Sequence, residues 1–325
     1  MLRPSYSITL DQTTLTEKTL GPFLAMEVRR SKSAGADEAL LSLGRVPEVN
    51  PAPEATVAIE VGWDGSTEPI FTGTVESVES GIDRMKIDCL GSQVKLMRMR
   101  ADRTFINQSA GQIVSALAGD AGVSTDTVED GIDFPVYLMD SSVGFYEHCV
   151  RLARKCGFDL YTTDEGDLVF AAFSIASADH TFKFGEQILS ASAERSVPLD
   201  VVAVVPESPA SSGGDDTASW FVKDPSSHKG EAGGGAIQLI LSDPYLRTKD
   251  SAEKAAKGRL YFSKRDSVTG TVELMGSPQV KLGQAVALEG VPKSGVDDVY
   301  QVMAVRHCLD PWQGFRTFVS LGGMP

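Results

Sequence analysis

The chain has 325 residues, of which 42% are hydrophobic and 23% charged, so it is long enough for two or three folded modules and too apolar to be mainly disordered. Its formal net charge of −14 argues against nucleic-acid recognition, because nonspecific binders cluster Lys and Arg against phosphates. The N-terminus carries no basic and apolar signal, and no apolar run reaches the ~18 residues that cross a bilayer. We therefore expect folding in a cytoplasm without membrane insertion.

Residues 1–100 are predicted to form an antiparallel β-barrel. Apolar and polar residues alternate in five runs, and turn sequences such as Asp64-Gly65-Ser66 separate them. The alternating residues are Ile8 and Leu10; Leu24, Met26 and Val28; Val57, Ile59, Val61 and Trp63; Phe71, Gly73 and Val75; and Met85, Ile87 and Cys89.

Residues 101–180 are predicted to form an α+β insertion domain. A helix is expected to begin at Ser109, because Gln112 stands three residues later and completes a capping box. A second helix is expected within 142–157 and should end at Gly157, which adopts a positive φ at little cost. Its buried stripe comprises Phe145, Cys149, Leu152 and Cys156. The strands that follow flank a hairpin loop at 164–167.

Residues 181–325 are predicted to form a second β-barrel that includes a long loop at 207–235 and a helix at 250–262. The loop is rich in Pro, Ser, Gly and Asp, and loops of this length are often functional. Its Trp220 and Phe221 are candidates for an anchor that orders on a partner, or equally for a loop tip that folds onto its own domain. The helix is expected to begin at Asp250, with Glu253 three residues on.

Four alternating strands follow this helix and suggest a small closed sheet. The residues expected on one face are Val268, Gly270, Val272 and Leu274; Val286 and Leu288; Tyr300, Val302 and Ala304; and Phe315, Thr317, Val319 and Leu321. The patterns together predict a mainly β fold with two antiparallel β-barrel domains and a small helix and hairpin domain.

The order of these elements resembles the phage late control gene D family, whose members are tail baseplate hub proteins related to the N-terminal part of the type VI VgrG spike. The resemblance is carried by AEKAAKGRL, SVTGTVELMGSPQVKLGQAVALEGV and YQVMAVRHCLDPWQGFRT near the C-terminus, by SVGFYEHCVRLARKCGFDLYTTDEGDLVF at 142–170, and more weakly by PIFTGTVESVES and RTFINQSAGQIVSALAGDAGV.

The resemblance implies a structural hub of a phage tail baseplate: a homotrimeric ring that joins a hexameric tail tube to a trimeric spike. Partners would be the tube protein, a separate spike protein and other baseplate proteins, and the virion tail would be the location. The spike is expected to be separate because this chain stops after the second barrel, whereas VgrG continues into a needle. A type VI or extracellular contractile injection system is an alternative setting for the same fold.

The residues that could carry chemistry do not form a recognisable catalytic, cofactor or metal motif. Four histidines and four cysteines are scattered without the spacing of a zinc ribbon, a nucleophile elbow or an H-E-x-x-H helix. We therefore expect no enzyme activity and no cofactor. A β-rich carbohydrate-binding or cell-wall hydrolase module is the alternative of another class, for which a carboxylate pair in a cleft would be needed.

Three regions are predicted to contact partners. Strand edges at Phe71, Thr72, Gly73 and Val75 would face the tube or a neighbouring chain. Trp220 and Phe221 would reach across a subunit boundary. The turn that carries Pro311 and Trp312 would lie near the spike, since aromatic residues concentrate at interface cores; the alternative is that Trp312 only covers a barrel end.

Overall fold

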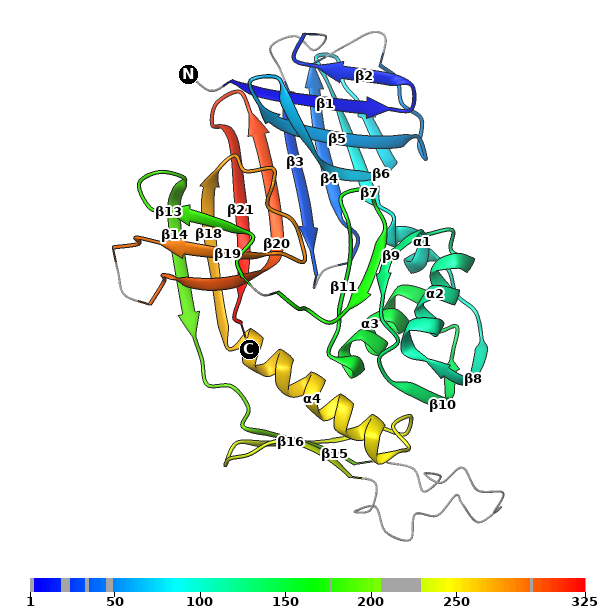
Figure 1. The fold of residues 1–325 in the computed structure, drawn as a ribbon. Coiled ribbons are helices and arrows are strands. Elements are labelled where there is room, and N and C mark those ends of the chain that lie inside the picture. Colours follow the sequence, from blue (N-terminus) through cyan, green and yellow to red (C-terminus); the bar gives the residue numbers. More distant parts are fainter. Residues whose placement is uncertain are drawn as a thin grey trace.

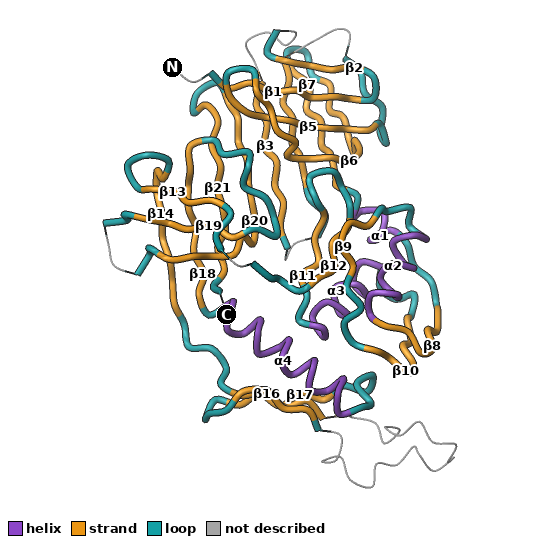
Figure 2. Tube along the Cα trace, viewed as in Figure 1, coloured by secondary structure: helices purple, strands orange, loops and turns teal. Residues whose placement is uncertain are grey.

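The computed structural model describes residues 3–18, 24–32, 35–44, 49–175, 177–205, 229–292 and 295–324. Two β-barrels lie next to each other, and an α+β module and a long helix with its own small sheet complete the molecule (Figures 1 and 2). The predicted fold class is confirmed. Buried apolar residues form three clusters, one in each barrel and one shared by the α+β module and the long helix.

The first barrel contains seven antiparallel strands, which pair in the order β3-β4-β7-β6-β5-β1-β2. Their side chains alternate between core and solvent as the sequence predicts, so that Ile8, Ile59 and Ile87 are all fully buried. The strands are β1 (Pro4–Leu10), β2 (Thr13–Thr16), β3 (Leu24–Ser31), β4 (Glu38–Gly44), β5 (Thr56–Trp63), β6 (Ser66–Ser80) and β7 (Arg84–Gly91).

The second barrel pairs its strands in the order β14-β18-β21-β20-β19-β13, and its β20 also pairs with β3 of the first barrel. Residues 304–309 of β20 lie antiparallel to residues 26–31 of β3, so both barrels share one 13-stranded sheet. The strands are β13 (His180–Lys183), β14 (Ile188–Arg195), β18 (Val268–Met275), β19 (Ala285–Glu289), β20 (Asp298–Asp310) and β21 (Gly314–Gly322).

The strand β20 changes phase along its length. Tyr300 and Val302 face the core as predicted, but the register shifts between Val302 and Ala304, and the buried residues beyond that point are Val305, His307 and Leu309. The prediction that Ala304 shares the buried face was therefore wrong. One extra residue in a β-bulge moves every following side chain to the other face of the strand.

The α+β module follows the first barrel in the chain. It contains α1 (Gln93–Arg98), β8 (Arg103–Ser109), α2 (Ala110–Asp120), β9 (Thr125–Val128), β10 (Asp133–Met139), α3 (Phe145–Cys156), β11 (Asp159–Thr162) and β12 (Leu168–Ala171). The capping box of Ser109 and Gln112 is present, and Gly157 ends α3 with a φ of 76°. The predicted hairpin is formed by β11 and β12.

A small sheet and the long helix α4 (Lys249–Asp266) pack onto the α+β module. The sheet contains β15 (Val201–Val205), β16 (Gly230–Gly233) and β17 (Gln238–Ser242). Val202, Val204, Ala256 and Leu260 belong to the same buried cluster as Leu152 of α3. The core that β15, β16 and α4 share with the α+β module thus crosses the boundary expected at residue 181.

Two local features of this region differ from the sequence-based expectation. The strand β16 lies inside the stretch expected to be loop at 207–235, and it pairs with β15. The helix α4 begins one residue earlier than expected and is capped by Thr248, whose side chain accepts a hydrogen bond from the Ser251 amide. Thr248 provides the hydroxyl at the N-cap position, so Asp250 is free to lie in the first turn.

Candidate functional site

The predicted contact residues of the first barrel lie in a central strand, not at an edge. The strand β6 pairs with β5 on one side and with β7 on the other. Phe71 and Val75 are buried in the barrel core, whereas Thr72 and Gly73 are partly exposed. Phe71 and Val75 therefore support the barrel from inside, and Thr72 and Gly73 are the members of this group that a partner could touch.

The turn between β20 and β21 presents Trp312 to solvent. Its side chain is 87% exposed, and Pro311 beside it is also exposed. Asp310 Oδ1 accepts hydrogen bonds from the backbone amides of Trp312 and Gln313, at 2.7 and 2.8 Å, and so fixes the turn. The other predicted anchor residues, Trp220 and Phe221, lie outside the described residues.

Apolar contacts join the ends of the two barrels. Leu309 and Phe315 from β20 and β21 belong to the core cluster of the first barrel. The rings of Trp63 and Phe315 lie 5.6 Å apart, and the Trp63 indole donates a hydrogen bond to the Gly276 carbonyl at 2.8 Å. Together with the shared sheet, these contacts make the two barrels a single packed unit.

A buried charge network lies where the barrels meet the α+β module. Arg30 of β3 pairs with Asp37, at 3.1 Å, and with Asp164 of the β11–β12 hairpin, and it donates to the Thr162 carbonyl. The Arg30 and Asp164 side chains are at most 5% exposed. Lys281 of the second barrel reaches the other oxygen of Asp164 at 2.7 Å. The carboxylate of Asp164 thus pairs with cations from both barrels.

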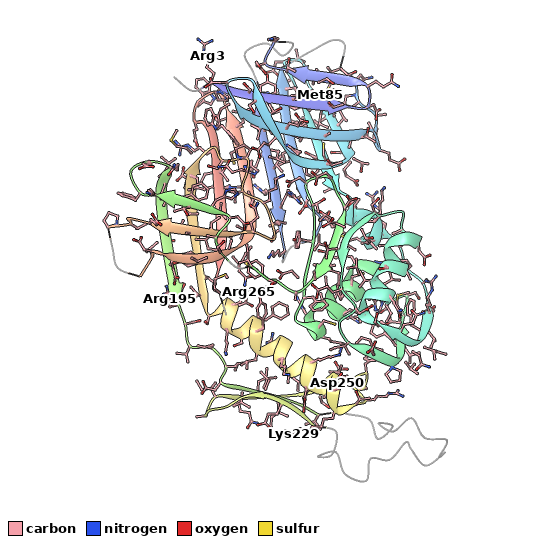
Figure 3. All side chains as sticks on the ribbon, in the orientation of Figure 1. Arg3, Met85, Arg195, Lys229, Asp250 and Arg265 are labelled. Carbon is pink, nitrogen blue, oxygen red and sulfur yellow. The ribbon has the colours of Figure 1, made fainter. Side chains whose placement is uncertain are left out.

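A second carboxylate in the same region links β3 to α4. Asp159 accepts from Lys32 at 2.6 Å and from Arg265 at 3.0 Å, and the Lys32 and Asp159 side chains are 2% and 5% exposed. Figure 3 shows Arg265 at the end of α4 that meets the barrels. Burial lowers the pKa of Lys32 from its usual value, and the contact with Asp159 opposes this shift. Neither cluster could be predicted from the sequence, since Asp164 lies more than 100 residues from Arg30, and Asp159 lies more than 100 residues from both Lys32 and Arg265.

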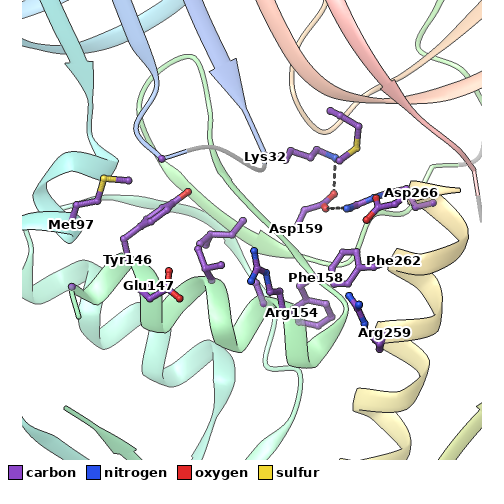
Figure 4. A pocket seen from close by; sticks show the side chains of 17 residues that line it. Lys32, Met97, Tyr146, Glu147, Arg154, Phe158, Asp159, Arg259, Phe262 and Asp266 are labelled. Carbon is purple, nitrogen blue, oxygen red and sulfur yellow. Dashed lines mark hydrogen bonds and ion pairs between the residues drawn. The ribbon is translucent and has the colours of Figure 1, made fainter. Parts of the chain in front are cut away.

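A cleft opens beside this network between α3, α4 and the two barrels (Figure 4). Its volume is about 770 Å³. Lys32 and Met303 line it from the barrels, and Tyr146, Arg154 and Arg259 line it from the helices. The cleft therefore lies at the junction of all the modules, where an occupant would contact each of them.

Several histidines and cysteines of the described residues are buried or hydrogen-bonded within the fold. Burial, assisted by the nearby charge of Arg30, lowers the pKa of His307 to about 3, so this imidazole is neutral at physiological pH. His148 lies between the Tyr137 hydroxyl and the Asp140 carbonyl. Burial also raises the pKa of the Cys149 thiol to about 12, which keeps it protonated and a poor nucleophile.

Two kinds of site are absent from the part of the chain that the structure describes. Its histidine, cysteine and acidic side chains form no group of three or more that could hold a metal ion. None of the helices described is both long and apolar enough to span a bilayer.

The architecture defines a class of protein in which two mainly antiparallel barrels share one sheet beside an α+β module. Several solved structures have this fold over nearly the full chain. The tail protein from Neisseria meningitidis MC58 has a TM-score of 0.74 at 14% identity, covering 99% of this chain and 97% of that one. The 43 kDa tail protein of prophage MuSo2 from Shewanella oneidensis has a TM-score of 0.70 at 16% identity, with 98% of each chain covered.

A third similar structure comes from a secretion system. A component of the E. coli type VI secretion system, described as structurally similar to the T4 bacteriophage tail proteins gp27 and gp5, has a TM-score of 0.62 at 11% identity and covers 98% of this chain and 79% of that one. The expected resemblance to phage tail and VgrG-related proteins is thus confirmed at the level of the fold.

The sequence comparisons give a different result. The family model that matches is described as the Alg8 N-terminal domain and covers residues 49–208. These residues include part of the first barrel, the α+β module and the strands β13, β14 and β15. The matching family is not the late control gene D family that the sequence motifs resemble. No curated protein matches the sequence.

Proposed function

We propose that this chain is a structural hub of a phage tail baseplate, of the late control gene D type, in which three copies form a ring between a hexameric tail tube and a separate trimeric spike. The observation that carries the proposal is the likeness of the whole chain, both barrels and the α+β module together, to phage tail proteins. Other baseplate proteins are its further partners, and its place is the virion tail after assembly in the bacterial cytoplasm.

The arrangement of the barrels suits this task. Because β3 and β20 pair directly, the two barrels of one chain hold a fixed relative position. Three chains would then present six barrel surfaces to a sixfold tube while keeping threefold symmetry toward a spike. A closed ring of this kind also avoids open-ended association.

The first test is the mass of the purified protein, measured by light scattering after size exclusion over a range of concentrations. A species near three times 34.7 kDa is expected. A monomer at every concentration that also fails to trimerise when its spike and tube proteins are added would contradict the proposal. Genes for tube, sheath and spike are expected beside this gene in both settings. Capsid genes among them would indicate a phage, and their absence would indicate an injection system.

We propose that Trp312 is a contact of the spike. Replacing this exposed residue by Ala should weaken spike binding about tenfold or more while the trimer stays intact, because buried tryptophans often dominate interface energies. Ile82 is 90% exposed in the turn between β6 and β7, and Ile82→Ala is the matched control. Spike affinity that is equal in the wild type and in Trp312→Ala would remove the assignment.

We propose that the 207–235 region contributes to assembly through Trp220 and Phe221. A deletion that tests this must leave β16 in place, because β16 pairs with β15 under α4. Removing residues 210–226 should weaken trimer formation or partner binding. If both are unchanged, the segment is dispensable for assembly.

We propose that the chain acts without catalysis. The protonated Cys149 thiol and the neutral, buried His307 support this, because neither can serve as a nucleophile or base for an outside substrate. The assay is incubation with purified peptidoglycan, in which no release of soluble sugar is expected. Release that persists in repurified protein would favour the hydrolase alternative.

A further inference from the structure

The helices α3 and α4 cross in close contact, and a cleft lies on each side of the crossing. A Cβ on Gly157 would lie 2.5 Å from the Gly258 Cα, so the two backbones touch there. The junction cleft of about 770 Å³ lies on one side, and a second cleft of about 340 Å³ lies on the other. Arg154 and Arg259 line both clefts, which places them at the connection between the two spaces.

Most cations around this double cleft already have a carboxylate partner. Lys32 and Arg265 share Asp159, while Lys155 pairs with Asp243. On α3, Arg151 pairs with Glu147 at 3.3 Å.

Arg154 and Arg259 are different. Both side chains are exposed at the mouth of the clefts, and no carboxylate of the described residues pairs with either one. In Figure 4 they lie on either side of Phe158. Two neighbouring guanidinium groups without a carboxylate partner are unexpected in a chain whose net charge is −14. Each offers a planar fork of donors that matches a carboxylate.

Aromatic and aliphatic side chains form part of the walls beneath the two arginines. Phe158, Phe262 and Val150 line the junction side, and Tyr137 and Tyr245 line the other side. The rings of Tyr137 and Tyr245 lie 5.1 Å apart. Clefts of a few hundred cubic ångströms are typical of binding sites, and arginine and tyrosine are enriched at interfaces.

We propose that this double cleft binds an acidic segment of a partner protein, with carboxylates on Arg154 and Arg259 and an apolar side chain against the aromatic walls. Charge complementarity identifies the occupant, because the two unpaired cations need anions and the aromatic walls need an apolar group next to them. A nucleic acid fits poorly, because the clefts offer two unpaired arginines and not the long run of Lys and Arg that follows a phosphate backbone. The proposal does not depend on the hub function.

The test is a fluorescence anisotropy titration of the full chain with a panel of labelled hexapeptides. Each contains four Asp or Glu residues around a central Leu, Phe, Tyr or Trp pair, and each has a counterpart with Asn and Gln in place of the acids. At least one acidic peptide should bind about tenfold or more tightly than its amide counterpart. Added salt should weaken that binding, because exposed charge pairs are screened.

Charge-reversal variants locate the binding. Arg154→Glu/Arg259→Glu should lower the affinity of the acidic peptide by about tenfold or more. Lys257→Glu/Lys264→Glu makes the same change in net charge at two exposed lysines of α4 that do not line either cleft, and its affinity should stay within about threefold of the wild type. If the charge reversal in the cleft impairs folding, the Gln double variant at the same positions replaces it.

Two outcomes would overturn the proposal. One is that no acidic peptide binds better than its amide counterpart. The other is that the lysine variant loses as much affinity as the arginine variant, which would assign the binding to overall charge instead of the cleft.

Discussion

Replacing Asp159 by Asn should be one of the most destabilising single changes at the module junction. The substitution keeps the shape of the side chain but removes the charge shared by Lys32 and Arg265. The Lys32 and Arg265 side chains are only 2% and 10% exposed, so neither can turn to water for compensation. Breaking a buried pair costs about 3–5 kcal/mol, because a buried charge is left without a partner.

The expected shift in melting temperature follows from this free-energy cost and the unfolding entropy of the chain. An unfolding entropy of about 2 cal/mol/K per residue gives roughly 0.7 kcal/mol/K for this chain, so Asp159→Asn should lower Tm by about 4–7 °C in calorimetry. Adding Lys32→Met should recover part of the loss, because it removes the ammonium group that the substitution leaves unpaired, whereas Arg265 keeps its pair with Asp266. Glu79→Gln is the control, since its pair with Lys86 is 3.2 Å long but exposed, and such pairs contribute little. An Asp159→Asn shift within about 1 °C of the Glu79→Gln shift would refute the account of the junction.

Two further predictions test the second barrel and the helix crossing. Burial lowers the pKa of His307 to about 3, below the ~6.5 of an unfolded chain, so its contribution to stability is present above pH 6.5 and is lost as the pH falls toward 3. By pH 4.5 the loss is roughly 3 kcal/mol, and urea unfolding of His307→Gln at pH 7.5 and 4.5 should show a pH dependence smaller by that amount; an unchanged dependence would contradict the assignment. Gly258→Ala should cost about 1–3 kcal/mol or more, because its Cβ would lie 2.6 Å from the Gly157 nitrogen. Gly119→Ala in α2, where the added Cβ meets nothing within 4 Å, should be neutral or stabilising in the same unfolding assay, and equal costs for the two would rule out the crossing as the cause.

The local elements of this fold were predictable from the sequence wherever the determining residues are neighbours in the chain. The Ser109 cap needs only Gln112 three residues away, and the end of α3 needs only Gly157. The last strand alternates without interruption, so Phe315 and its successors were placed correctly. In β20 the same rule failed beyond Val302, because a bulge adds one residue without leaving a signal in the alternation.

The division of the chain into modules was less predictable, because it depends on which core each element joins. The helix α4 directly precedes β18, so the sequence favoured its assignment to the second-barrel domain. Its buried face is built from small residues such as Ala252 and Ala256, and these allow the close approach of β16 and α3. Gly258 has the same role at the crossing with Gly157. Alanine and glycine in a sequence indicate that another element can pack closely against the helix, but they do not identify that element.

The buried charge network at the module junction could not be predicted from the sequence, and it affects how the modules dock. Arg30, Lys32, Asp159 and Asp164 are ordinary charged residues of strands and turns when the sequence is considered alone. In an isolated barrel or hairpin each would be hydrated, and docking the modules removes that water from all of them together. Any shifted arrangement would bury at least one of these charges without its partner, at a cost of several kcal/mol. The network therefore opposes misdocked arrangements more strongly than it stabilises the correct one, and we expect the barrels and the α+β module to keep one relative position when a partner occupies the adjacent cleft.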